Sequence, residues 1–221
     1  MKEPLDMNKL GKGRKGPWDT TKRKYNLNHF VGKTYTLSEG LEHRGVADYI
    51  ENKLTGHIIS DYGGLKARSQ RSIEDVGLED YSYLVDIKTK DGDKEFHMPN
   101  LVSVDRVRKF YFNDNNVIEY VFVDYNKRDT EVTIKNIEYY KIEEIDWDCL
   151  QIANLGKGQI QIRDAKKPIK KYDGSREEWL KELRIRVLLF LDKQIKKRKS
   201  EKIIWKSLNN EKDKEKDKRS N

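Results

Sequence analysis

The sequence predicts one α/β or α+β domain in which helices flank a mixed central β-sheet. The length of 221 residues suffices for a single domain with a hydrophobic core and is short for two domains of ordinary size. Aromatic bulk from 12 Tyr, 6 Phe and 4 Trp argues against a disordered chain. Apolar residues alternate between helical and strand spacing along the chain, and this alternation favours the mixed class.

The first half of the chain is expected to hold an arm, a helix and a hairpin. Val46, Ile50 and Leu54 recur at helical spacing, whereas the runs IEDVGL and YLVDIKT are typical of strands. The expected segments are a basic N-terminal arm over 1–40, a helix over about 40–54 ending at Gly56, a loop over 61–72, and a hairpin of 73–78 with 83–89.

The second half is expected to alternate helices with the strongest strands of the chain. Ser175 and Glu178 form a capping box, which opens the clearest helix of the sequence. The expected segments are a helix over 99–112, strands over 117–125 and 131–145, the helix after Ser175, and a charged, disordered tail over 209–221. The folded domain is therefore placed at residues 41–208.

Charge is distributed unevenly along the chain. The formal net charge is +8, of which residues 1–24 carry +5 and residues 196–221 carry +6, so the middle of the chain carries −3. A basic polymer binder would spread its cations along its whole length. Acids held between basic ends suggest a metal or catalytic centre that meets a polyanion.

Several classes of protein are disfavoured by what the sequence lacks. No apolar run approaches the roughly 18 residues of a membrane span, and the first residues have no signal-peptide core, so we expect a cytoplasmic protein. One cysteine, Cys149, and four histidines without ligand spacing argue against disulfide and zinc chemistry. Neither a phosphate-binding loop motif nor a dinucleotide fingerprint occurs.

Asp86 and Lys88 are the residues that suggest chemistry. Residues i and i+2 of a strand share a face, so both side chains project to the same side, and the preceding strand can bring Asp75 alongside. Two carboxylates can hold Mg²⁺, which keeps several waters. A lysine beside the metal can orient the attacking water or stabilise the transition state. This combination is what phosphodiester hydrolysis needs.

A structural explanation of the same residues stays open. Charged residues make up 38% of the chain, so a D-x-K pattern also arises by chance. Asp86 and Lys88 lie in an apolar run, where an unpaired charge would be costly, and a salt bridge between them would remove that cost.

The motif is similar to a known family signature. Asp75, Asp86 and Lys88 match the PD-(D/E)xK pattern in its D-x-K form, and blocks such as KTKDGDKEFHMPNLVS and GQIQIRDAKK resemble Type II restriction endonucleases of the EcoRV/HincII-like group, over roughly residues 42–195. The resemblance implies a restriction-endonuclease-like fold and a Mg²⁺-dependent homodimer. Such a dimer would cut both strands of double-stranded DNA at a short palindrome, with blunt 5′-phosphate and 3′-hydroxyl ends, beside a cognate DNA methyltransferase.

The resemblance also implies roles for particular acids. Asp75 and Asp86 would be metal ligands, and Lys88 the catalytic cation. Glu74 stands where the family has proline, so Asp80 is an alternative first carboxylate, although Asp80 would lie in the hairpin turn. An additional acid on the early helix would be Glu42 or, second, Glu51, and a solvated helix acid is an equal alternative for each.

Residues that would contact DNA are carried over from the same blocks. They are the loop residues Lys66, Arg68, Gln70 and Arg71, then His97, Asn100 and Ser103, and finally Asn154 and Lys157 in a Gly-containing turn. Ordinary exposed loops would explain the same residues, and Asn100 could simply cap a helix. Two other functions stay open: a structure-specific repair or junction nuclease of the same fold, and a non-enzymatic nucleic-acid-binding protein that uses the basic ends.

Overall fold

The structure, a computed structural model, describes residues 25–38, 40, 43–61, 65–67, 75–78, 83–93, 99–111, 116–164 and 166–219, with side chains as far as residue 207. The chain divides into two compact units, Met1–Trp179 and Leu180–Asn221. Among the described residues, the first unit holds all the strands and both shorter α-helices, and the second consists of the greater part of one long helix.

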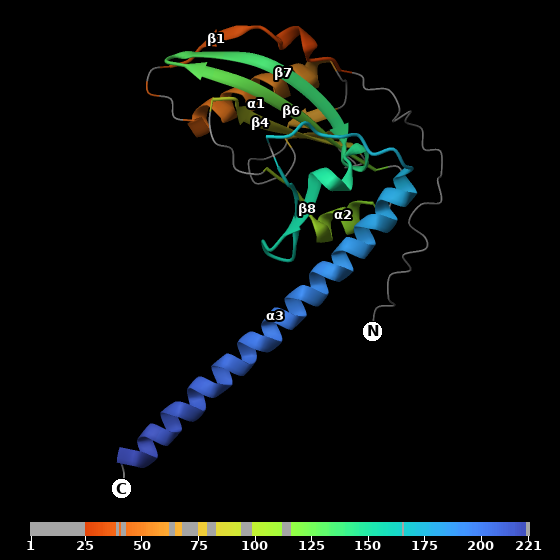
Figure 1. Cartoon of the computed structure of the whole chain (residues 1–221). Helices are drawn as coiled ribbons and strands as arrows, with labels where there is room; N and C mark the ends of the chain where they lie inside the picture. Colours follow the sequence, from red (N-terminus) through yellow and green to blue (C-terminus); the bar gives the residue numbers. More distant parts are fainter. Residues whose placement is uncertain are drawn as a thin grey trace. The chain divides into compact units, whose positions relative to one another are not determined.

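A mixed six-stranded sheet forms the centre of the first unit (Figure 1). Its order is β1-β7-β6-β4-β3-β2, in which β4 and β6 are parallel and the other neighbours are antiparallel. The strands are β1 Thr34–Thr36, β2 Leu65–Ala67, β3 Val76–Leu78, β4 Tyr83–Asp91, β6 Val117–Arg128 and β7 Glu131–Lys141. This mixed sheet with flanking helices confirms the predicted α+β class.

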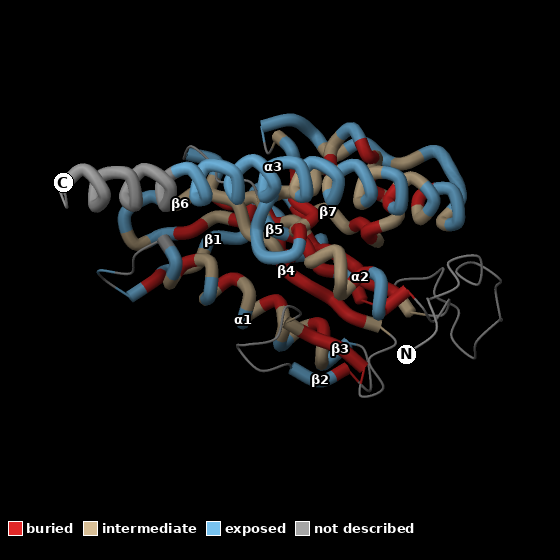
Figure 2. The backbone as a smooth tube through the Cα atoms, turned by 90° about the horizontal axis from the view of Figure 1, so that it is seen from below, coloured by how far each residue is buried: buried red, intermediate tan, exposed pale blue. Residues whose placement is uncertain are grey.

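The core lies between this sheet and α1 (His43–Asp61). Val46, Ile50, Leu54 and Ile58 recur every four residues along α1, and each is at most 1% exposed. They share one cluster with alternate residues of the central strands, namely Val85, Ile87, Val121 and Val123. Figure 2 shows the same pattern, with burial concentrated in α1 and the central strands.

The predicted end of this helix at Gly56 is wrong, because α1 continues to Asp61. Burial of Ile58, at 0% exposure, stabilises the additional turn by an amount larger than the intrinsic cost of a mid-helix glycine, about 1 kcal/mol. The predicted hairpin is confirmed, since Val76 and Gly77 of β3 pair antiparallel with Val85 and Leu84 of β4.

A second, three-stranded sheet corrects another prediction. It has the order β5-β9-β8, with β5 Asn100–Ser103, β8 Leu150–Ala153 and β9 Gln159–Ile162. The helix predicted over 99–112 is therefore only the short α2, Val104–Phe110, because the preceding four residues pair with β9. Ser103 caps α2 by accepting a hydrogen bond from Arg106 N at 3.2 Å.

The long helix α3 spans Arg176–Arg219. Its predicted capping box is confirmed: Ser175 N donates to Glu178 Oε2 at 2.7 Å, and Glu178 N donates to Ser175 Oγ at 3.2 Å. The helical backbone continues through residues 209–219, where the sequence predicted disorder; this stretch lacks Gly and Pro and is rich in the helix formers Lys and Glu. None of the described helices is long and apolar enough to cross a membrane.

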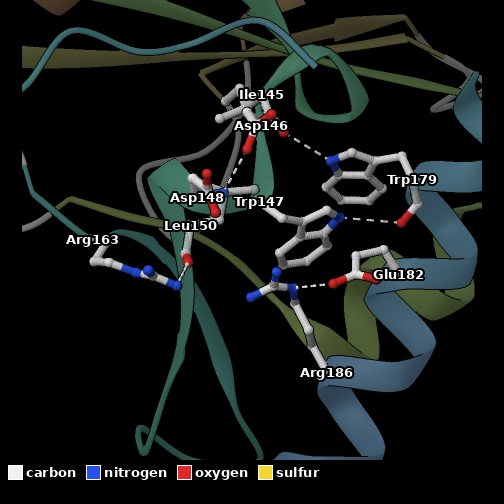
Figure 3. A network of polar contacts seen from close by, with 9 residues as sticks. All are labelled: Ile145, Asp146, Trp147, Asp148, Leu150, Arg163, Trp179, Glu182 and Arg186. Atoms are coloured by element: carbon white, nitrogen blue, oxygen red, sulfur yellow. Dashed lines mark hydrogen bonds and ion pairs between the residues drawn. The ribbon is translucent and has the colours of Figure 1, made fainter. Parts of the chain in front are cut away.

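Two tryptophans fix the start of α3 within the first unit (Figure 3). The rings of Trp147 and Trp179 stack with centroids 4.7 Å apart. Trp179 Nε1 donates to Ile145 O at 2.9 Å, and Trp147 Nε1 donates to Trp179 O at 3.3 Å. Both indoles are nearly fully buried, so they pack and hydrogen-bond within the fold.

Candidate active site

Asp86 and Lys88 lie on one face of β4, as the two-residue spacing predicts. Asp86 is 3% exposed, and its Oδ2 lies 2.7 Å from Lys88 Nζ. The two atoms form an ion pair, but Asp86 Oδ2 accepts no well-aligned hydrogen bond from the described residues. The Lys88 side chain keeps 24% of its surface exposed, so the pair opens to solvent on the lysine side.

Asp75 lies immediately before β3 and beside the same segment of β4. Its amide donates to Val85 O at 3.1 Å, and its Oδ2 accepts from Ile87 N at 2.6 Å. The register of β3 with β4 stops at Val76 and Val85, so the Asp75 side chain takes over the acceptor role for the next β4 amide. The structure thereby places Asp75 against the residues on both sides of Asp86, while Asp80 lies outside the described residues.

Glu51 reaches this cluster from α1. Burial, followed by the charges of Asp75 and Asp48, raises the pKa of Glu51 to about 7, against the opposing effect of Lys88. Glu51 is therefore electrostatically coupled to Asp75 and Lys88. Glu42, the first choice from the sequence, lies outside the described residues.

The charges of the cluster are mutually dependent. Burial raises the pKa of Asp86 to about 8; Lys88 opposes this rise, whereas Asp75 and Glu51 add to it. Burial alone would lower the pKa of Lys88, but Asp86, Asp75 and Glu51 together raise it above its ordinary value. When all three carboxyl groups are ionised, their charge exceeds that of the single ammonium, and either protons or a bound cation would relieve their mutual repulsion.

The donor set fits Mg²⁺ through few protein ligands. Among the described residues, no three Asp, Glu, His or Cys side chains form a ready-made metal cage. Mg²⁺ needs no such cage, because it is commonly held by one or two carboxylates, with waters and substrate phosphates completing the shell. Asp86, with its unsatisfied buried Oδ2, and Asp75 are the residues that could hold the ion. Glu51 is coupled to both of them electrostatically.

The residues expected to contact DNA are distributed over several elements. Lys66 is exposed on β2, Asn100 is exposed at the start of β5, and Asn154 and Lys157 are exposed in the turn between β8 and β9. Ser103 is the N-cap of α2. Arg68, Gln70, Arg71 and His97 lie outside the described residues.

The alternative explanation of Asn100 as a helix cap is wrong, because Ser103 occupies that position. Asn100 Oδ1 instead accepts a hydrogen bond from Gln161 Nε2 of the neighbouring strand β9. The turn that carries Asn154 and Lys157 uses Gly156 and Gly158 at φ values of 56° and 107°, which favour glycine.

Two features of the site region were missed in the sequence. Glu119 of β6 is 2% exposed and accepts hydrogen bonds from Tyr83 and, at 2.7 Å, from Tyr25. A cavity also begins at Lys88 and extends over β6 and β7. Polar residues at alternate positions of the strand runs, such as Asp124 and Glu138, were the available signal, because they mark a sheet face that the core does not cover completely.

Similarity to known proteins is found at the level of three-dimensional structure. No protein-family model and no curated protein sequence matches the chain. Among solved structures, the chain is similar to the NlaIV restriction endonuclease at 12% sequence identity and a TM-score of 0.48; the match covers 68% of this chain and 71% of that chain.

Proposed function

We propose that the protein is a Mg²⁺-dependent nuclease, and more specifically a Type II restriction endonuclease that hydrolyses both strands of double-stranded DNA. The observation that carries this proposal is the convergence of Asp75, Asp86 and Lys88 at one point of β4, with Glu51 from α1 coupled to them. The motif residues lie 11 and 13 positions after Asp75 in sequence, and strand pairing brings them together.

Each residue has a distinct role in this proposal. Asp75 and Asp86 would hold the metal, and Lys88 would orient the attacking water or stabilise negative charge on the phosphate. A bound Mg²⁺ would lower the pKa of a coordinated water and neutralise charge on the phosphate oxygens. Glu51, whose pKa burial raises to about 7, would serve as the proton acceptor at neutral pH.

The proposal includes a homodimer in which each subunit cuts one strand of a short palindrome to leave blunt 5′-phosphate ends. Two-fold symmetry in the protein matches two-fold symmetry in the DNA site. Exposed apolar side chains on α3 support self-association: Ile185, Leu188, Leu189, Leu191 and Ile195 are between 43% and 56% exposed. A cognate methyltransferase would protect the host DNA.

The testing experiment is a digest of unmethylated phage and plasmid DNA with and without Mg²⁺, followed by sequencing of the ends. Discrete Mg²⁺-dependent fragments that share one end sequence are the expected result. If the protein cleaves branched or mismatched DNA but gives no such fragments, the proposed site-specific endonuclease is wrong. A structure-specific repair nuclease would then be the better description. Intact DNA of every kind would refute the nuclease.

One observation favours a different function. The 2.7 Å contact between Asp86 and Lys88 is also what a purely structural salt bridge would show, and the chain would then bind nucleic acid through its basic ends without cutting it. Such a protein would cut no DNA and would bind it with equal affinity in Mg²⁺ and in chelator.

A further inference from the structure

A cavity of about 270 Å³ adjoins Lys88 on the face of the sheet that carries the candidate active site. Its floor consists of β4, β6 and β7, and its other wall comes from Ile162 of β9 and the segment 166–169. Both walls belong to the first unit of the chain. The cavity therefore extends the candidate active site and is lined by residues that the proposed hydrolysis does not use, apart from Lys88.

The residues of the floor lie side by side because the strands that carry them are paired in register. Lys88 pairs with Phe122, which pairs with Glu138; two residues along the strands, Lys90 pairs with Asp124, which pairs with Asn136. Alternate residues of a strand share a face, so all six side chains lie on the same side of the sheet. Five of these six positions are polar and none of the six residues is buried, so the face is open to a polar ligand.

The charge of the lining favours an anion. Four lysines, Lys88, Lys90, Lys166 and Lys167, face two carboxylates, those of Asp124 and Glu138. Lys167 also lies 3.5 Å from Asp164, but its side chain is 78% exposed, so this ion pair is weak and the ammonium can turn towards a ligand. The DNA substrate of the proposed hydrolysis would bring a phosphate to the adjacent candidate active site.

The apolar part of the lining favours a flat group attached to that anion. The ring of Phe122 is fixed by Tyr120 and Tyr140, whose ring centroids each lie 6.0 Å from its own, and it lines the cavity. Aromatic rings are the usual stacking partners of unpaired bases. The Asn136 amide and the Glu138 carboxylate offer hydrogen bonds to a base edge.

We propose that this cavity binds a single unstacked nucleotide of the DNA strand next to the phosphate that is cut. Its base would lie against Phe122 and its phosphate beside Lys90, Lys166 and Lys167. The volume lies just below the roughly 300–1,000 Å³ of small-molecule sites, which is the scale of one small ligand. The position beside the cleaved bond rests on the proposed function, whereas the nucleotide chemistry rests on the lining alone.

The first test is a titration of the full chain, without metal, with each of the four deoxynucleoside 5′-monophosphates and separately with inorganic phosphate. Backbone amide shifts in ¹⁵N NMR spectra should locate binding at residues 88–90, 122–124 and 136–138, with the nucleotides binding more tightly than phosphate. Equal affinity for nucleotide and phosphate would show a site for a phosphate alone and overturn the proposal, as would the absence of binding.

The second test uses variants outside the proposed catalytic residues. Phe122→Leu should weaken nucleotide binding about tenfold, the size of one base–aromatic stack, and leave phosphate binding unchanged. Lys167→Gln should weaken the binding of both the nucleotides and inorganic phosphate. Lys135→Gln, an exposed β7 residue outside the cavity, is the matched control and should bind as the wild type does. Unchanged nucleotide affinity in a folded Phe122→Leu protein would overturn the proposal.

These measurements separate this inference from the nuclease proposal, because they involve neither Mg²⁺ nor cleavage. A chain that binds nucleotides in the cavity but cuts no DNA would keep the nucleotide site and refute the nuclease. A chain that cuts DNA but binds no nucleotide in the cavity would refute this inference alone.

Discussion

Asp86 is a buried carboxylate whose Oδ2 has one ion-pair contact, that with Lys88, among the described residues. Burial disfavours the charged form of this carboxyl and raises its pKa to about 8, so ionised Asp86 destabilises the folded state. A chain that keeps this carboxylate on its central strand therefore bears a cost to stability that a functional role would explain.

Asp86→Asn should lower the rate of DNA cleavage by at least about 100- to 1,000-fold, the usual effect of removing one group that stabilises the transition state. The substitution removes the charge and keeps the shape, so DNA binding in the presence of Ca²⁺ should persist. Cleavage rates and gel-shift affinities are the measurements, and Glu131→Gln, an exposed acid of β7, is the control. Wild-type cleavage by the Asp86→Asn protein would remove Asp86 from the site.

The stability of the metal-free protein should fall as the pH rises from about 4 to 8. Asp86 and Glu51 have folded-state pKa values of about 8 and about 7, above those of an unfolded chain. The folded state therefore holds protons that the unfolded state releases, and each such carboxyl contributes a slope of up to about 1.4 kcal/mol per pH unit. Lys88, whose pKa is raised, is protonated in both states over this range and adds no slope.

Urea unfolding at pH 5, 6, 7 and 8 measures this slope, and Asp86→Asn should flatten it. Mg²⁺ competes with protons for the same carboxylates, so its addition should raise the unfolding midpoint more at pH 8 than at pH 5. A stability that rises with pH between 5 and 8 in the metal-free protein would contradict the electrostatic description of the cluster.

At the scale of elements, α1 shows how packing overrides local preference. Gly56 lies inside α1, and a Cβ built on it would meet no atom within 4 Å. Burial of Ile58 keeps the helix intact past this residue. The same helix carries Glu51 to the candidate active site, so its continuity and its position matter for function as well as for stability.

Gly56→Ala should stabilise the protein by about 0.5–1 kcal/mol, because alanine has the higher helix propensity and the site has room for the methyl group. Gly32→Ala is the matched control: it also has open space around it, but its φ of +81° disfavours alanine, so it should destabilise. Thermal unfolding of both variants is the measurement. A Gly56→Ala protein that is less stable than the wild type would show that α1 is strained at this point.

At the scale of the molecule, the long helix α3 forms most of the second unit and exposes a set of large apolar side chains. Leu188 is 52% exposed, and Leu189 is 56% exposed. Side chains of this size usually lie in an interface when several gather on one helix. The proposed homodimer gives them one.

Leu188→Glu should shift the protein from dimer to monomer, because it places a charge among the apolar side chains of α3. Lys199→Glu, the control, introduces glutamate at another exposed position of the same helix. It should leave the molecular mass of the dimer in solution unchanged. Light scattering after size-exclusion chromatography measures the mass. A monomeric wild-type protein at micromolar concentration would refute self-association through α3.

Local sequence patterns determined several parts of this protein. The two-residue spacing of Asp86 and Lys88 placed them on one face of a strand, and the spacing of Ser175 and Glu178 gave a capping box, because both depend on backbone geometry within a few residues. The hairpin of β3 and β4 followed from the same short-range signals.

Tertiary structure decided the rest. The choice of Glu51 as the coupled acid, the pairing of β5 with β9 in place of a longer helix, and the cavity over Phe122 all depend on contacts between segments far apart in the sequence. Periodicity cannot report these, since it shows which face of an element is apolar and not which element covers it. Burial then turned a common D-x-K pattern into a coupled set of charges, because desolvation depends on the surrounding fold and not on neighbouring residues.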